Sequence, residues 1–408
     1  MPLASIADLP NELLVDIFEY PTFPTEALYF LALLCRRLHL VALPIYFSRN
    51  GIHLEKKSAT ITLGTDKWDS LSALQICLFI SSMEHVSCIF PHPSCTTVFP
   101  IIAQMKRLRT FISQLSFVGK VTLNLDSTGH GRSRCLSTGT DEDLKDWTDQ
   151  YGALLNCIVQ KGCKSLTVLN GGQLTETYQL EAPGWSERFL SRAVQRFSPS
   201  QEPRTPGFGR KFGRGLDIRL QTVPSSTMHH LNSLHLHSAT LLVAPGLDWT
   251  LSALLHCPVT SLTICMSRVG GDTRLWRKVL RLIASAAPNL TTLSLIEVAR
   301  HNEPAAFAFL AHLSHLTDLD LDLTYPLCDP SGPICLFKSL VTLRAAPSVV
   351  DYLLARVGPG SASFRAIRSI TVVWNPSLDT LLVLIRPMVS VASRLRARGI
   401  APQITVEV

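Results

Sequence analysis

The sequence predicts an α/β protein in which three short N-terminal helices precede an irregular leucine-repeat solenoid with a parallel sheet. Three observations predict this fold. Apolar residues among the first fifty positions recur at helical spacing. Leucines of the later chain recur in a strand-like pattern at a nearly regular interval, and the segments between them again have helical spacing.

The composition is that of a chain that folds over most of its length. Of its 408 residues, 46% are apolar and 17% are charged, far from the composition of disordered chains. The net charge of +7 is spread along the chain and forms no basic arm, so we expect no nucleic-acid partner. Apolar runs such as Leu28–Cys35 are too short to span a membrane, and acidic residues stand where a secretory signal would carry bases. We expect a soluble cytoplasmic or nuclear protein.

The cysteines and histidines predict neither a metal site nor a cofactor. The eleven cysteines are scattered and lack the two-residue spacing that presents two thiolates to one metal ion. Four histidines cluster at His229, His230, His235 and His237, and the last two share the strand face opposite the neighbouring leucines. No nearby thiol or carboxylate completes a ligand set, so we expect no metal.

The first fifty residues predict two or three short helices. The first runs from about Pro10, which fits a first helical turn, to Tyr20, before Pro21 and Pro24. Its apolar stripe consists of Leu9, Leu13, Leu14, Ile17 and Phe18. A second periodic run consists of Leu28, Leu31, Leu34, Cys35 and Leu38, and an apolar cluster follows at Val41, Ala42, Leu43, Pro44, Tyr46 and Phe47.

The order of residues in this region is more informative than its periodicity. It reads Leu-Pro-Asn-Glu-Leu-Leu-Val-Asp-Ile-Phe at Leu9–Phe18, Cys-Arg-Arg-Leu-His at Cys35–His39 and Ala-Leu-Pro-Ile-Tyr-Phe at Ala42–Phe47. This order closely resembles the F-box motif, particularly that of fungal F-box proteins. The resemblance implies an F-box over residues 1–50 that binds a Skp-family adaptor. The adaptor-binding positions that it implies are Leu9, Pro10, Leu13, Leu14, Ile17, Leu34, Leu38, Leu43 and Pro44.

One departure and one alternative accompany this resemblance. Many F-boxes carry a tryptophan where Leu38 stands, although leucine is an accepted variant there. A motif of this size cannot bury all its large apolar residues internally, which favours a partner groove. Alternatively, the helices cap the repeats against solvent. The two interpretations differ in whether Leu13, Ile17 and Leu43 are buried within the chain or exposed.

Residues 51–408 are predicted to form a leucine-repeat body that binds a protein target. The pattern Leu-x-x-Leu-x-Leu, or a close relative, has its middle position at Leu234, Leu262, Leu293, Leu319, Leu343 and Ile370. These positions lie roughly 24–31 residues apart, in or near the range of about 20–29 for leucine-rich repeats. Weaker copies are Leu108/Phe111, Leu123/Leu125, Leu166/Val168 and Ile404/Val406.

The segments between these strands predict the helices that complete each repeat. Helical faces lie at Leu275–Ile283, Val350–Val357 and Leu378–Ile385, the last opened by Pro376. The body resembles the irregular leucine-rich repeats that often follow an F-box, although most copies lack the asparagine of regular repeats. The alternative is a mixed α/β domain with leucine-rich strands. Under either interpretation, Asp318, Asp320 and Asp322 face away from the strand leucines and contact a ligand or solvent.

Two segments interrupt the pattern and are predicted to be surface insertions, residues 126–149 and 198–215. The second is rich in Gly, Pro and Arg but lacks the preceding strand and the lysine of a phosphate-binding loop. Its Ser198-Pro199 and Thr205-Pro206 dipeptides are candidate sites of proline-directed phosphorylation.

No motif of the sequence pairs a nucleophile with a base, so we expect no enzyme activity from this chain. Its resemblance implies a non-catalytic substrate receptor of an SCF-type, cullin-RING ubiquitin ligase. In such a ligase the F-box binds the Skp adaptor, the adaptor binds a cullin, and the repeats hold a target protein. Two alternatives remain: a leucine-repeat interaction scaffold outside a ubiquitin ligase, and a hydrolase without a recognisable motif.

Overall fold

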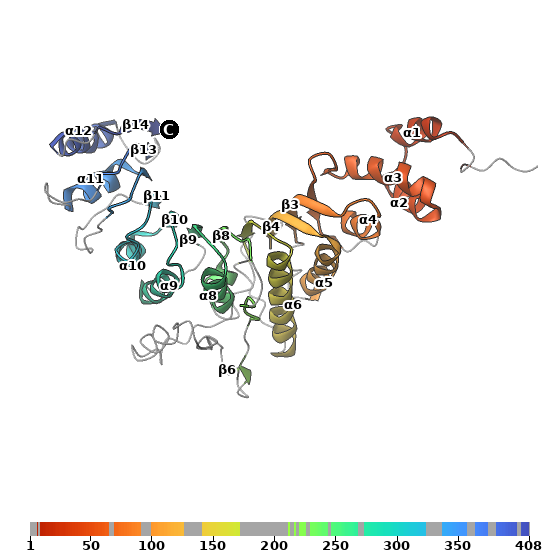
Figure 1. Ribbon diagram of the computed structural model, residues 1–408, viewed down its shortest axis with the longest axis horizontal. Helices are drawn as coiled ribbons and strands as arrows, with labels where there is room; N and C mark the ends of the chain where they lie inside the picture. Colours follow the sequence, from red (N-terminus) through yellow and green to blue (C-terminus); the bar gives the residue numbers. More distant parts are fainter. Residues whose placement is uncertain are drawn as a thin grey trace, which may run out of the picture. The chain divides into compact units, whose positions relative to one another are not determined.

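The computed structural model describes residues 6, 9–64, 69–90, 99–125, 141–171, 211–212, 216–217, 220–225, 229–243, 246–267, 273–323, 337–356, 364–373, 381–397 and 401–407. In 99–100, 141–144, 211–212, 216–217, 356 and 381–388 it describes the backbone alone. The fold is α/β, with mostly parallel strands that alternate with helices (Figure 1). The chain divides into two compact units, residues 1–173 and 174–408.

Unit 1 contains the three predicted N-terminal helices and a five-stranded part of the sheet. Its helices are α1 Asn11–Glu19, α2 Thr25–Leu34, α3 Arg36–Arg49, α4 Ser70–Ile76, α5 Phe99–Gln114 and α6 Asp141–Gln160. Its strands are β1 Ile52–His53, β2 Ser58–Thr62, β3 Ser82–Ile89, β4 Phe117–Asn124 and β5 Ser165–Leu169. Strand β1 pairs antiparallel with β2, and β2 to β5 pair in parallel in the order of the chain.

Unit 2 repeats the same strand–helix alternation. Its strands are β6 Lys211–Phe212, β7 Leu216–Asp217, β8 Ser233–His237, β9 Ser261–Cys265, β10 Thr292–Val298, β11 Asp318–Leu323, β12 Thr342–Ala345, β13 Ser369–Val373 and β14 Gln403–Glu407. Its helices are η3 Ala239–Leu241, α8 Gly246–His256, α9 Thr273–Ala286, η4 Arg300–Asn302, α10 Glu303–Leu310, α11 Pro347–Arg356 and α12 Leu381–Ala397. Strands β8 to β14 pair in parallel in the order of the chain, and β6 and β7 form a separate antiparallel pair.

The register of unit 2 places the predicted strand leucines side by side. Leu234, Leu262, Leu293, Leu319, Leu343 and Ile370 form one continuous row across the strands from β8 to β13. All six are buried. Because neighbouring parallel strands share this register, the same face of every strand packs against the helices. Helix α9 covers part of that face with Trp276, Val279, Leu280 and Ile283, all buried.

Two segments differ from the sequence-based expectation. Leu108 and Phe111, interpreted as a weak strand copy, lie in α5, because the buried residues Ile101, Met105 and Leu108 continue one helical face. Residues 141–149, expected to belong to a surface insertion, form the first turns of α6, where Trp147 packs at 4.8 Å from the ring of Tyr151. Residues 126–140, 198–210, 213–215, Leu378 and the Ser-Pro and Thr-Pro dipeptides lie outside the described residues.

Candidate functional site

The three-helix module, defined as α1, α2 and α3, has a filled apolar core. Its buried side chains include Leu14, Phe18, Leu28, Leu38, Leu43 and Phe47, each at most 1% exposed. The extended backbone of Cys35 separates α2 from α3. Together with the buried Tyr46, these core residues are seven of the 18 Leu, Ile, Val, Phe and Tyr residues of the three helices.

Other apolar residues of the three-helix module face outward. On α1, Leu13 is 48% and Ile17 is 39% exposed, and these residues lie one turn apart on one helix face. On α2, Leu34 is 68% exposed, next to the exposed Leu33 and one turn from the exposed Phe30. Each of the two helices therefore presents its own apolar stripe.

The nine residues that the F-box resemblance implied as adaptor contacts divide into three groups. Pro10, Leu13, Ile17 and Leu34 are exposed; Leu9 and Pro44 are half-buried; Leu14, Leu38 and Leu43 are buried in the core. The sequence-based reasoning missed Tyr20, Phe30, Leu33 and Leu40, which are also exposed. A signal for those on α2 was available, because Leu28–Leu34 is apolar on all sides and a small module cannot bury every side of a helix.

Two arginines hold α1 in place on the module. The Nε of Arg37 donates to Asn11 Oδ1 at 2.8 Å, and its Nη2 donates to the Leu9 carbonyl, at the start of α1. At the other end, Arg49 donates to the Phe18 carbonyl at 2.7 Å and to the Phe23 carbonyl at 2.6 Å. Charge-assisted hydrogen bonds at both ends fix the direction in which Leu13 and Ile17 point.

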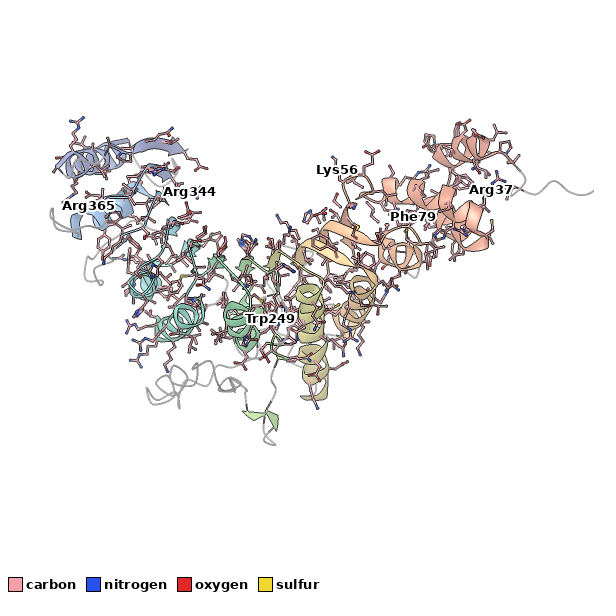
Figure 2. All side chains as sticks on the ribbon, viewed as in Figure 1. Arg37, Lys56, Phe79, Trp249, Arg344 and Arg365 are labelled. Atoms are coloured by element: carbon pink, nitrogen blue, oxygen red, sulfur yellow. The ribbon has the colours of Figure 1, made fainter. Side chains whose placement is uncertain are left out.

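The three-helix module is attached to the rest of unit 1 through the segment after α4. Phe79 packs with its ring centroid 6.2 Å from His39 and 6.3 Å from Phe47, both on α3 (Figure 2). The Leu78 N–H donates to His39 Nε2 at 3.4 Å, so Nδ1 carries the proton and donates to the Ala32 carbonyl at 3.1 Å. His39 thus links α2 and α3 to the segment between α4 and β3.

Tyr46 provides a second connection between α3 and α4. Burial, and secondarily the negative charge of Asp69, raises the pKa of Tyr46 to about 12, while a hydrogen bond with Ser70 acts in the opposite direction. Asp69 caps α4 by accepting from the Ser72 N–H at 2.9 Å and pairs with Arg107 at 2.5 Å. The neutral phenol is therefore the form that this interface favours.

We expect Tyr46→Phe to weaken the alkaline sensitivity of the fold. Because the folded state raises the pKa above the ordinary value near 10, Tyr46 contributes stability below about pH 10, and that contribution is lost as the pH rises toward 12. The parent should lose about 1 kcal/mol more than the variant between about pH 8 and about pH 11. Urea denaturation at about pH 8 and about pH 11 checks this. Equal losses in the two proteins would contradict it.

The open sheet face of unit 2 is the face opposite the buried leucines, and it carries a continuous row of polar residues. In register across the strands from β8 to β14, this row is His235, Thr263, Ser294, Asp320, Arg344, Thr371 and Thr405. Its members bond to one another. Ser294 Oγ donates to Asp320 Oδ2 at 3.1 Å, and Arg344 Nη1 donates to Asp320 Oδ1 at 2.9 Å.

Acidic side chains dominate the part of the open sheet face around β11. Asp318, Asp320 and Asp322 alternate with the buried Leu319, Leu321 and Leu323 along this strand. Arg344 joins Asp320 to Glu407, whose Oε2 accepts from Arg344 Nε at 3.0 Å. The hydrogen bond with Arg344 lowers the pKa of Glu407, and the same pairing raises the pKa of Arg344. Arg344 thus offsets one of these two negative charges, and β11 carries Asp318 and Asp322 in addition.

The structure brings one serine and one histidine together, which no sequence motif indicated. Ser233 Oγ lies 2.8 Å from His235 Nε2, and His235 Nδ1 lies 2.9 Å from Thr263 Oγ1. The geometry has the hydroxyl–imidazole part of a catalytic triad. A threonine hydroxyl replaces the carboxylate of that template and lacks the negative charge that stabilises an imidazolium ion. Through Thr263, His235 links β8 to β9.

The described residues contain neither a cluster of metal ligands nor a membrane-spanning helix. No three His, Cys, Asp or Glu side chains gather there as metal ligands. No helix of the described chain has the length and apolar character needed to cross a bilayer. The described cysteines are unpaired, and burial raises the pKa of Cys265 and Cys163, which keeps these thiols protonated.

The comparisons with known proteins assign no family. No protein-family model matches the chain, and no curated protein matches it in sequence.

Proposed function

We propose that the chain is the substrate receptor of an SCF-type ubiquitin ligase. The three-helix module binds a Skp-family adaptor as an F-box, and a leucine-repeat solenoid holds the target protein. The observation that carries the proposal is the exposure of Leu13, Ile17 and Leu34 on a module whose own core is already filled. Apolar side chains at these F-box positions are unfavourable in water, and a partner that covers them removes this cost.

The scaffold alternative is favoured by one specific observation. Leu43 is buried and Phe47 packs against Phe79, so the inner side of the module covers the start of the sheet as a repeat cap would. This packing is compatible with the receptor proposal. Capping uses the side of the module that carries Leu43 and Phe47, whereas adaptor binding uses the exposed Leu13, Ile17 and Leu34. A rigid attachment also suits a receptor, whose contribution to ubiquitin transfer is to hold the target in place.

We assign target binding to the open sheet face of unit 2. Its Ser, Thr and Asp side chains leave hydrogen-bonding groups on a face that no described helix covers (Figure 2). The acidic residues of β11 favour a target segment that carries bases. The ligase role itself requires only positioning, so no reactive side chain of this chain takes part.

The test is binding of the full-length chain to a purified Skp-family adaptor, beside a Leu13→Asp, Ile17→Asp double variant. In the complex, the two introduced aspartates would be buried against the adaptor without a partner for their charge. We therefore expect at least a hundredfold loss of affinity, about 3 kcal/mol. Glu12→Ala, a change on the same helix at an exposed polar residue, is the matched control and should bind like the parent.

Circular dichroism of each protein separates lost binding from lost folding. Binding by the parent and the control, with loss in the folded double variant, supports the proposal. A folded parent that does not bind the adaptor overturns it in favour of the scaffold.

A further inference from the structure

Unit 2 has its exposed large apolar residues at one end. Among its described residues these are Val389 on α12 and Ile404 and Val406 on β14, with Val406 47% exposed. The register partners of the last two, Ile370 and Val372 on β13, are completely buried. The two buried apolar rows of the sheet therefore continue into β14, where their last residues, Ile404 and Val406, are exposed.

The backbone N–H and C=O groups on the edge of β14 that faces away from β13 are also available for pairing with another strand. The Gln403 N–H donates to the Arg368 carbonyl at 2.8 Å, toward β13. Because backbone groups alternate sides along a strand, the N–H and C=O of Gln403, Thr405 and Glu407 face β13, and those of Ile404 and Val406 face outward. In the described chain, β14 is the last strand of the sheet order, and no strand pairs with its outer edge.

We propose that the outer edge of β14 binds β14 of a second copy of this chain, antiparallel, with Thr405 on the two-fold axis. In this register, Ile404 and Val406 of one copy stand opposite Val406 and Ile404 of the other. They are the residues whose backbone groups face outward, so each opposed pair exchanges two hydrogen bonds, as an antiparallel hydrogen-bonded pair requires.

The side chains of β14 are self-complementary in the same register. On the apolar face, Ile404 lies opposite Val406 of the other copy, which places branched side chains in cross-strand contact. On the polar face, Gln403 lies opposite Glu407 of the other copy, so an amide donor meets a carboxylate, and Thr405 meets its own equivalent. No like charges face each other. A two-fold interface needs this self-complementarity, whereas a strand shaped for an unrelated partner does not.

The neighbouring residues position the strand for such pairing. Arg344 bonds Glu407 across β13 and thereby holds the exposed strand flat against the sheet. Edge strands are commonly protected from pairing by lysine or proline, and β14 contains neither in Gln403–Glu407.

The experiment measures the mass of the full-length chain by light scattering after gel filtration over a series of loading concentrations. We expect a concentration-dependent shift from 45.0 kDa toward twice that value. Val406→Pro removes one outward N–H and no bond to β13, so the variant should remain folded, with a dimer dissociation constant raised at least about tenfold. Ile404→Lys with Val406→Lys should have the same effect through charge repulsion.

Two controls make the outcome decisive. Leu78→Lys places a lysine on an exposed leucine of unit 1, and this variant should dimerise like the parent. Leu13→Asp with Ile17→Asp, the variant that removes the adaptor surface, should also dimerise like the parent, so dimerisation and adaptor binding are tested independently. A parent that stays monomeric at all concentrations, or a dimer that the β14 variants leave intact, overturns the proposal.

Discussion

Replacing Leu14 by alanine is expected to destabilise unit 1 by about 3 kcal/mol, whereas replacing its neighbour Leu13 should cost less than about 0.5 kcal/mol. The two residues have the same side chain and adjacent places in α1. The side chain of Leu14 is completely buried in the core of the three-helix module, while that of Leu13 is 48% exposed. The difference arises because alanine leaves a cavity at position 14 and leaves only solvent at position 13.

Urea denaturation of the full-length chain, followed by the helical circular dichroism signal, measures both changes. The same two variants separate stability from binding. Leu13→Ala should weaken adaptor binding in a protein that denatures like the parent, and Leu14→Ala should shift the denaturation midpoint. If both variants were destabilised equally, Leu13 would belong to the core, and the surface assigned to the adaptor would lose its main residue.

The sequence predicted the sheet of unit 2 well, for a physical reason. A strand with one buried face needs apolar residues at every second position, so Leu234, Leu293 and Leu319 identified both the strand and its inward face. The parallel register then follows, since each strand–helix step returns the chain to the same side. Strand positions in the part of the chain before residue 126 were less clear, because Leu108 and Phe111 have a spacing that both a strand and a helix can use.

The division of the three-helix module into core and surface was less predictable. Leu13 and Leu14 both fit the apolar stripe of α1, and only the packing of α3 decides which one is covered. The long-range bonds of Arg37 and Arg49 to α1 and to the following turn leave no periodic trace in the sequence. The contact of Phe79 with α3 was likewise not predictable, because a single aromatic residue after a short helix has no pattern that points to α3.

Gly246→Ala is expected to destabilise unit 2 by about 3 kcal/mol. Gly246 opens α8, and a Cβ atom there would overlap the Thr240 carbonyl oxygen and lie 3.1 Å from the Leu241 Cα. Both are backbone atoms of η3, which Thr250 holds close by donating to the Leu241 carbonyl at 2.6 Å. Backbone atoms cannot avoid the added Cβ by a change of rotamer, so α8 itself would have to shift.

A shift of α8 is costly because the helix is buried along nearly its whole length. Trp249 and Leu251 are at most 2% exposed, so any movement opens contacts in the core of unit 2. The better helix propensity of alanine recovers only about 1 kcal/mol. Gly51→Ala is the matched control: it has nothing within 4 Å of the added Cβ, and its φ of +71° costs only about 1–2 kcal/mol. Urea denaturation should therefore rank Gly246→Ala as the more damaging change, and the reverse order would mean that α8 and η3 do not approach each other as closely as described.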